Sequence, residues 1–273
     1  MKNNKINLLR EVLTVRNYAP RTIDTYIKAI NTFFSFSNQT SPSQKLLFDY
    51  ALFLKNKNLS FSHIKNCVMA VKLYSELMLG IKLNSNFLSH YRKERKLPDV
   101  LSIEEIKLVI DSIENLKHRT SISLIYSCGL RISECVNIKV SDIDSKRMMI
   151  KVVQSKGKKD RYVPLSGKML LLLREYYKGY KPKEYLFEGQ TEKYYSTRSI
   201  QSILKSAISK TKIKKKISVH SLRHSYATHL LEQGTDISLI QKLLGHKDIK
   251  TTLLYTQISQ SQISKIKNPF DTF

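Results

Sequence analysis

One charged stretch constrains the fold more than any other feature, because it divides the chain in two. Residues 89–100 read SHYRKERKLPDV. Pro98 disfavours a helix through the residue before it, and a charged segment closed by a proline is typical of a linker. We therefore expect an N-terminal domain over residues 1–90, a linker over 91–100 and a C-terminal domain over 101–273.

The N-terminal region has the apolar spacing of helices. After Pro20, a residue type favoured in a first helical turn, apolar residues recur at helical intervals. They are Ile23, Tyr26, Ile27, Ile30, Phe33 and Phe34. A second apolar stripe ends at Gly80, which suits a helix C-terminus. With shorter segments at 4–15 and 43–56, the pattern predicts a bundle of about four helices.

The C-terminal region is predicted to be mostly helical, with one exception. Residues 147–165 read RMMIKVVQSKGKKDRYVPL, and two short apolar runs around a glycine-containing basic turn predict a β-hairpin with a lysine-rich tip. A helix should begin after Ser102, which stands in capping-box spacing with Glu105. Further helices are expected over 166–178, 197–210, 220–232, 237–244 and 249–257, with Gly234 and Gly245 as breaks and Asp236 and Asp248 as N-caps. The predicted fold class is mainly α in two domains, a helical bundle followed by a mixed α/β domain with a small β-hairpin.

The composition excludes several classes of protein. The sequence contains no run of about 18 consecutive apolar residues, and its N-terminus carries charges where a signal peptide has an apolar core. Cys67, Cys128 and Cys135 lack CxxC spacing, so we expect reduced core residues and neither a disulfide framework nor a zinc site. We expect a soluble, cytoplasmic protein.

The charge balance points to a polyanionic partner. The chain has 47 Lys and Arg against 22 Asp and Glu, a net charge of +25. Residues 1–98 carry 16 basic and 5 acidic residues, and residues 99–273 carry 31 and 17. Because both regions share the excess, we expect both to contact double-stranded DNA, although a generally basic proteome would give the same balance. In the linker, Arg92, Lys93, Arg95 and Lys96 are candidate phosphate contacts, with a solvated charge run as the alternative.

The motifs argue against nucleotide or metal chemistry. The sequence contains neither G-x-x-x-x-G-K-[ST] nor G-x-G-x-x-G. Asp142 and Asp144 are the nearest carboxylate pair, but their place before the hairpin favours a turn-forming role over metal binding. If this chain cleaves nucleic acid, we expect it to do so without a metal or other cofactor.

Phosphoryl transfer without a metal requires cations around the phosphate. His220 and Arg223 are spaced i, i+3, so both can leave one helix face toward one point. Such a pair is also common by chance. Arg131 follows Gly129 at a turn between helices, where it either pairs with an acid such as Glu134 or points into a site.

The same chemistry requires an acid and a nucleophile. Lys156 at the hairpin tip could serve as the acid, with Lys158 and Lys159 as competitors for that role and as candidate DNA contacts, although tip lysines are more often solvated. His246 could instead cap a helix dipole. Tyr255 is by default a core aromatic, but its phenol could form a covalent phosphotyrosine that conserves the energy of the diester.

Taken together, the order of these motifs resembles one family. GLRISE, SKGKKDRYVPL, HSLRHSYATHLL and LLGHKDIKTTLLYT follow one another as in the catalytic domain of the tyrosine recombinases, the phage integrase family, most closely its compact Xer-type members. NYAPRTIDTYIKAINTFFSF resembles, more weakly, the family's N-terminal SAM-like core-site-binding domain. The resemblance implies a site-specific recombinase with six catalytic residues: Arg131, Lys156, His220, Arg223, His246 and Tyr255.

The resemblance also implies a role for each catalytic residue. Arg131 and Arg223 would bind the phosphate, Lys156 would protonate the leaving 5′ oxygen, and His220 would transfer a proton near the tyrosine. His246 would donate to a nonbridging oxygen and Tyr255 would be the nucleophile. His224 and His229 fall outside this set and are expected to be structural.

The resemblance further implies how the protein assembles and works. Strands would be exchanged through a Holliday junction, in a homotetramer or a heterotetramer with a paralogue, on DNA with inverted-repeat core sites. The tail at about 258–273 resembles the segment that the family exchanges between subunits. Two alternatives remain open: a DNA-relaxing enzyme similar to type IB topoisomerases, and a non-enzymatic regulator, because residues 235–255 also scan as a helix-turn-helix.

Overall fold

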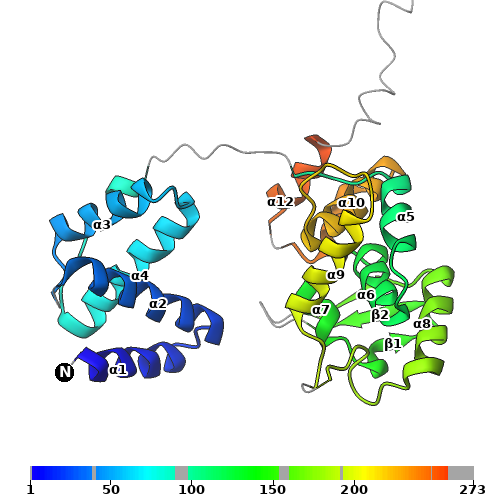
Figure 1. Ribbon diagram of the computed structural model, residues 1–273, viewed down its shortest axis with the longest axis horizontal. Helices are drawn as coiled ribbons and strands as arrows, with labels where there is room; N and C mark the ends of the chain where they lie inside the picture. Colours follow the sequence, from blue (N-terminus) through cyan, green and yellow to red (C-terminus); the bar gives the residue numbers. More distant parts are fainter. Residues whose placement is uncertain are drawn as a thin grey trace, which may run out of the picture. The chain divides into compact units, whose positions relative to one another are not determined.

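The chain divides into two compact units, Met1–Arg95 and Lys96–Phe273. The computed structural model describes residues 2–38, 41–89, 98–153, 160–190, 193–246 and 248–257 (Figure 1). The predicted linker at 91–100 falls largely outside these residues and stays a prediction, as do the DNA contacts expected at Arg92, Lys93, Arg95 and Lys96.

The N-terminal unit is a helical bundle, as predicted. Its elements are α1 (Lys2–Val15), α2 (Pro20–Ser37), α3 (Gln44–Asn56), α4 (Phe61–Leu79) and the short 3₁₀ helix η1 (Asn86–Leu88). Helix α2 buries the face that its apolar spacing marked and packs mainly against α4. In the core, Phe33 meets Tyr50, and Phe34 meets Tyr74, in edge-to-face contacts with ring centroids 5.2 and 5.4 Å apart.

Local signals set the helix ends of this unit. Pro20 occupies the first turn of α2, and Gly80 ends α4 in the left-handed conformation. The side chains of Ser43 and Ser60 accept hydrogen bonds from backbone N–H groups in the first turns of α3 and α4. The predicted bundle is therefore confirmed in its elements and in most of its boundaries.

The C-terminal unit is mostly helical around a small sheet. Its helices are α5 (Ile103–Asp111), α6 (Leu116–Ser127), α7 (Ile132–Asn137), α8 (Gly167–Tyr180), α9 (Thr197–Ser209), α10 (Val219–Glu232), α11 (Ile237–Leu244) and α12 (Lys250–Leu253), with 3₁₀ helices η2 (Val140–Asp142) and η3 (Leu254–Gln257). The strands are β1 (Ile143–Asp144), β2 (Met149–Val152) and β3 (Arg161–Pro164). The capping box predicted for Ser102 and Glu105 is present at the start of α5.

The sheet has three antiparallel strands in the order β1-β2-β3, one more than the predicted hairpin. Strand β1 has only two residues, so it leaves too little alternation to be recognised in the sequence. Asp142 and Asp144 form turns around it, as expected. The Asp142 carboxylate accepts from the Lys139 backbone N–H, and the Asp144 carboxylate accepts from those of Lys146 and Arg147.

Helix α10 is the buried centre of this unit. It packs against α6, α9, α11 and η3, and most of its side chains are inaccessible to solvent. The polar residues of α10 are spread around the helix and do not form one solvent-exposed face, as is typical of a helix buried on most sides. The Ser225 hydroxyl on α10 accepts from the backbone N–H of Leu101, so the first described turn of the unit is attached to this helix.

The segment after α10 departs from the prediction in its last part. Asp236 caps α11 as expected, accepting from the N–H groups of Ser238 and Leu239. The helix predicted over 249–257 is instead the four-residue α12 followed by η3, with Ile249 in the N-cap position and the Asp248 carboxylate accepting from the Lys250 N–H. Helix α12 has about one turn, too short for a recognition helix, which removes the structural basis of the helix-turn-helix alternative.

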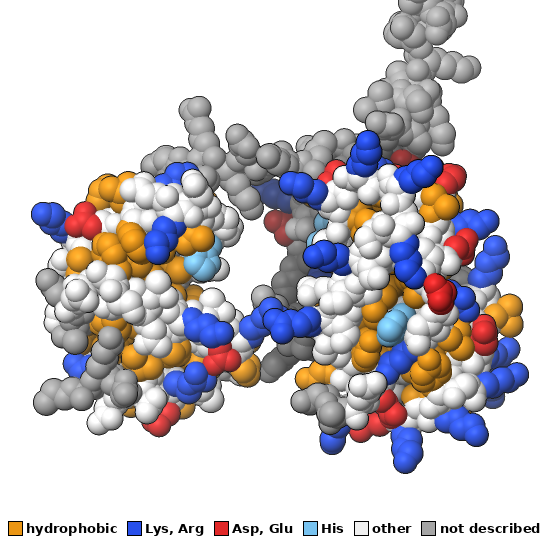
Figure 2. Space-filling view, in the orientation of Figure 1, with side chains coloured by type: hydrophobic (Ala, Val, Ile, Leu, Met, Phe, Trp, Pro, Cys, Tyr) orange, Lys and Arg blue, Asp and Glu red, His pale blue; other side chains and the backbone are white. Residues whose placement is uncertain are grey.

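Three further expectations concern the interior and surface. Cys67, Cys128 and Cys135 are buried and free, as predicted. Lys and Arg side chains are scattered over the visible surfaces of both units and outnumber acidic ones there (Figure 2). Among the described helices, none is long and apolar enough to cross a membrane.

Candidate active site

Five of the predicted catalytic residues lie in the described part of the C-terminal unit. Arg131 is the N-cap of α7, His220 and Arg223 lie on α10, His246 follows α11, and Tyr255 lies in η3. Lys156, Lys158 and Lys159 fall outside the described residues, so their expected roles stay predictions.

Arg131 both pairs with an acid and reaches across the site. Its guanidinium donates to the Glu134 carboxylate at 2.7 Å and to the backbone carbonyl of Gly245 at 3.3 Å. Its backbone N–H donates to the other Glu134 oxygen at 2.7 Å. The pairing with an acid that the sequence offered as one alternative is therefore present, and the Arg131 side chain stays 37% exposed. A role for Arg131 in a site stays a prediction.

Arg223 is fully buried, and most of its contacts are to the backbone. Its two terminal nitrogens donate to the carbonyls of Gly129 at 2.7 Å and Leu244 at 2.5 Å. Its Nε has no hydrogen-bond partner among the described residues. Burial and the nearby charge of Arg131 lower the pKa of Arg223 to about 10, which leaves it charged at neutral pH. A buried cation with a free donor is suited to bind an anion.

Gly129, whose carbonyl accepts from Arg223, lies in a turn with no room for a side chain. It adopts a positive φ of 58°, and a Cβ atom there would lie 2.4 Å from the Tyr226 ring. A larger residue would therefore meet both backbone strain and a steric clash. The turn before Arg131 therefore depends on the positive φ of Gly129 as well as on the hydrogen bond from the Arg131 N–H to Glu134.

Arg161, on β3, was not singled out in the sequence. It makes a bidentate pair with Glu134 at 2.9 and 2.8 Å and donates through Nε to the Leu243 carbonyl. Burial would raise the pKa of Glu134, but the bonds and charge of Arg161, the Arg131 N–H and the charge of Arg223 lower it to about 2. Three arginines thus surround one ionised carboxylate, which leaves a net charge of +2.

Tyr255 lies beside this cationic cluster. Its side chain is 1% exposed and belongs to a small apolar cluster with Tyr226, Ile240 and Leu244. Burial raises the pKa of its phenol, while the charges of Arg223 and Arg131 act in the opposite direction. The hydroxyl is therefore protonated in the DNA-free protein, and the charges of Arg223 and Arg131 are what favours its ionisation.

His246 packs beside the tyrosine. The two rings are nearly parallel, with an interplanar angle of 17° and centroids 6.3 Å apart. The His246 Nδ1 lies 3.0 Å from the buried Thr252 hydroxyl, which fixes the ring orientation. Burial and the charges of Arg223 and Arg131 lower the pKa of His246 to about 3, so the ring is neutral at pH 7 and has one N–H to donate.

Of the three histidines on α10, His224 lies nearer to Tyr255 than its expected structural role implied. His220 is exposed and contacts the ring of His224 edge to face, with centroids 4.5 Å apart. His224, expected to be structural, has its Nδ1 3.1 Å from the Tyr255 hydroxyl. The signal that could have found it is its i, i+4 spacing from His220. His229 pairs with the Tyr126 hydroxyl at 2.9 Å, away from the site residues.

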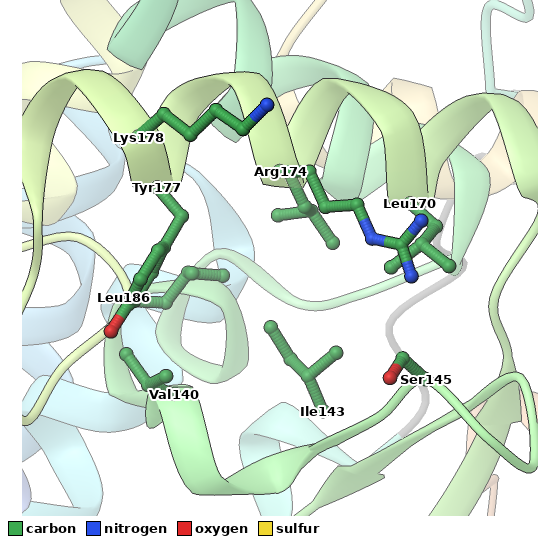
Figure 3. A pocket seen from close by; sticks show the side chains of 9 residues that line it. Val140, Ile143, Ser145, Leu170, Arg174, Tyr177, Lys178 and Leu186 are labelled. Carbon is green, nitrogen blue, oxygen red and sulfur yellow. The ribbon is translucent and has the colours of Figure 1, made fainter.

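The arrangement is suited to anionic chemistry. The described residues include no group of His, Cys, Asp and Glu that could hold a metal ion. An apolar pocket of about 300 Å³ lies between α8 and the η2–β1 segment and contains none of the predicted catalytic residues (Figure 3). The site is therefore the arginine cluster with its neighbouring tyrosine and histidines, where buried donors and a net positive charge can hold a phosphate next to a phenol.

Two family models and several known proteins match this chain. The phage integrase family model matches residues 99–262, and the model of the phage integrase N-terminal SAM-like domain matches residues 6–85. A putative integrase/recombinase, y4qK of Sinorhizobium fredii, is 34% identical over 268 residues, covering 96% of this chain and 87% of that protein. Tyrosine recombinase XerC of Natranaerobius thermophilus is 29% identical over 296 residues, covering 99% of each chain.

A solved structure shares the fold. The XerH site-specific recombinase bound to palindromic difH substrate, in a post-cleavage complex, matches with a TM-score of 0.72 and 23% identity over 92% of this chain and 80% of that one. This likeness confirms the predicted fold class. Because the family model covers more than half of the sequence, the chain belongs to the phage integrase family, the tyrosine recombinases.

Proposed function

We propose that this protein is a site-specific recombinase that cleaves DNA through a covalent bond between Tyr255 and a 3′ phosphate. The observation that carries the proposal is the position of Tyr255, a buried phenol beside His246 and within electrostatic reach of Arg131 and Arg223. A nucleophile that attacks an anionic diester requires such cations, because they offset the repulsion between the two negative groups.

Each site residue has a role in this reaction. Arg131 and Arg223 bind the nonbridging oxygens, and His246 donates a further hydrogen bond. The net charge of +2 around Glu134 matches the two negative charges of a phosphodiester attacked by a phenolate. Lys156 protonates the leaving 5′ oxygen, and His220 assists proton transfer.

Religation reverses the same chemistry on a second duplex. A 5′ hydroxyl attacks the phosphotyrosine, and two such rounds exchange strands through a Holliday junction. The substrate is double-stranded DNA with inverted-repeat core sites, a proposal supported by the recombinase relatives and by the palindromic substrate in the XerH complex. A tetramer of this chain, alone or with a paralogue, performs the exchange, with residues 258–273 passing between subunits.

A nicked suicide substrate tests the nucleophile. On such DNA the cleaved fragment diffuses away, so the covalent adduct accumulates. We expect wild-type protein to form a denaturant-resistant adduct without added metal, and Tyr255→Phe to form none while retaining noncovalent binding. An adduct in Tyr255→Phe would show that another residue is the nucleophile.

A plasmid with two core sites tests strand exchange separately. Recombination should give resolved or inverted products. Relaxation of the plasmid without such products would instead favour the topoisomerase-like alternative.

A further inference from the structure

We propose that His224 accepts the phenolic proton of Tyr255 as the tyrosine attacks DNA, a role that rests on the function proposed above. The His224 Nδ1 lies 3.1 Å from the Tyr255 hydroxyl, within hydrogen-bonding distance, and the ring centroids are 5.6 Å apart. A general base must lie within such reach of the proton that it removes.

His224 has the protonation state that this role requires. Burial, followed by the charges of His220 and Arg223, lowers the pKa of His224 to about 4, so the imidazole is neutral at pH 7. The phenol of Tyr255 is protonated in this state, because burial raises its pKa. The hydroxyl therefore donates and Nδ1 accepts, which leaves the ring proton on Nε2.

The described residues offer the Tyr255 hydroxyl one acceptor. Among the described residues, His224 is the only hydrogen-bond partner of the Tyr255 hydroxyl. His246 faces the same ring, but its Nδ1 contacts the Thr252 hydroxyl. His220, to which the resemblance gave a proton-transfer role, contacts the His224 ring and is exposed, so it can pass a proton between His224 and water.

The step balances in atoms and charge. As the Tyr255 oxygen bonds to phosphorus, the P–O5′ bond breaks, the phenolic proton passes to His224 Nδ1, and the leaving oxygen takes a proton from the acid proposed as Lys156. The resulting imidazolium lies close to Arg223 and is a strong acid. It can return its proton to the tyrosine oxygen when a 5′ hydroxyl displaces the phosphotyrosine in religation.

His229 provides a matched control on the same helix. It is buried, whereas His224 is partly buried, and its Nδ1 also meets a tyrosine hydroxyl, that of Tyr126, at 2.9 Å. The two histidines therefore share a helix and a contact between Nδ1 and a phenol, but only His224 contacts Tyr255. A purely structural role of buried histidines on α10 would make both positions equally sensitive.

Adduct formation on the suicide substrate tests the proposal. His224→Asn retains an oxygen acceptor near the Nδ1 position without its basicity, and His224→Phe retains ring volume without an acceptor. We expect both variants to slow adduct formation by about 100-fold with unchanged noncovalent binding, and His229→Asn to stay within about threefold of wild type. A rate for His224→Asn near that of wild type, or an equal loss in His229→Asn, would overturn the proposal.

A change of leaving group distinguishes the proton transfer from Tyr255 to His224 from the proton transfer to the leaving 5′ oxygen. A substrate with sulfur in place of the bridging 5′ oxygen leaves as a thiolate and needs no acid. The defect of His224→Asn should persist on this substrate, whereas that of Lys156→Ala should be relieved. Rescue of His224→Asn by sulfur would place His224 on the leaving-group side and overturn its assignment to the nucleophile.

A measurement without DNA separates this proposal from the proposed function. Histidine ¹⁵N spectra of the full-length protein at pH 7 should show His224 with an unprotonated Nδ1, and Tyr255→Phe should shift that resonance. An unchanged resonance would overturn the hydrogen bond whatever the activity. Absence of an adduct in wild type, or its presence in Tyr255→Phe, would instead overturn the proposed function.

Discussion

The interiors of the two units differ in how many charged side chains they bury. In the N-terminal unit, the only polar side chain buried among the described residues is Ser75, and the core consists of aliphatic and aromatic residues. The C-terminal unit buries Glu134, Arg161 and Arg223 beside its apolar core. Buried charges cost desolvation free energy that an apolar core does not incur. The second unit therefore keeps an interior that is less favourable for stability and better suited to binding an anion.

The largest effect should come from the buried cation. Arg223→Gln removes the charge and the free donor, so adduct formation on the suicide substrate should fall by about 1,000-fold, while noncovalent binding changes much less. Circular dichroism would establish that the variant is folded. Arg147→Gln is the matched control, because Arg147 is 83% exposed and only loosely paired with Asp144. An equal loss in both arginine variants would mean that general charge, and not the buried site, drives cleavage.

The next effect concerns stability. Glu134→Gln removes the carboxylate that Arg161 and Arg131 share, and an uncompensated buried charge should lower the free energy of unfolding of the C-terminal unit by about 3 kcal/mol. Hydrogen exchange followed unit by unit would measure it. Phe33→Ala should lower the stability of the N-terminal unit by a similar amount, about 3 to 5 kcal/mol, through a cavity in its apolar core.

If either variant lowered the unfolding free energy of both units, the difference between their interiors would not hold. Glu134→Gln should also impair cleavage, because it releases Arg131. Phe33→Ala should leave the cleavage rate of folded, DNA-bound protein unchanged. A normal cleavage rate in Glu134→Gln would mean that the carboxylate holds the fold without orienting the arginine.

The smallest effect is a difference in pH dependence. In the folded protein the pKa values of His224 and His246 are lowered to about 4 and about 3, chiefly by burial. The unfolded chain takes up protons at these positions below about pH 6.5, whereas the folded chain does not. The stability of the C-terminal unit is therefore full above that pH. Because both rings are partly exposed and solvent screens their interactions, the loss from pH 6.5 to pH 4 should be roughly 2 kcal/mol, less than half of what the unscreened pKa shifts would give.

Calorimetry across this pH range would measure that loss. Glu134 adds to it at lower pH, from about 4.5 down to its folded pKa of about 2. The transition of the N-terminal unit, identified by its response to Phe33→Ala, should move less, because no histidine is buried among its described residues. His246→Gln should flatten the slope of the C-terminal unit. A parallel fall of both transitions would point to general surface charge.

Much of the fold could be predicted because its signals are local. Gly80, Gly245, Asp236 and the Ser102 capping box act within a few residues of their own positions, so spacing and residue type revealed the ends of the helices. Strand β1 and the end of α12 could not be found this way. Each spans only about one period of its pattern, two residues for β1 and four for α12, so the pattern is not repeated.

Part of the candidate site, but not its contacts, could be predicted from the sequence. The order of motifs indicated Arg131, Arg223, His246 and Tyr255, which the structure gathers in one place. Arg161 and His224 were missed because their partners, Glu134 and Tyr255, lie 27 and 31 residues away along the chain. Only folding reveals such pairs.

The acceptors of Arg223 have a consequence for how this sequence can evolve. Both are backbone carbonyls, those of Gly129 and Leu244, so no single substitution nearby deletes either acceptor atom. A substitution that changes only the side chain of a residue supplying such a carbonyl leaves the acceptor atom in place. Gly129 is the exception, since any Cβ there would strike the Tyr226 ring. Of the two residues that supply these carbonyls, Gly129 should therefore tolerate substitution least.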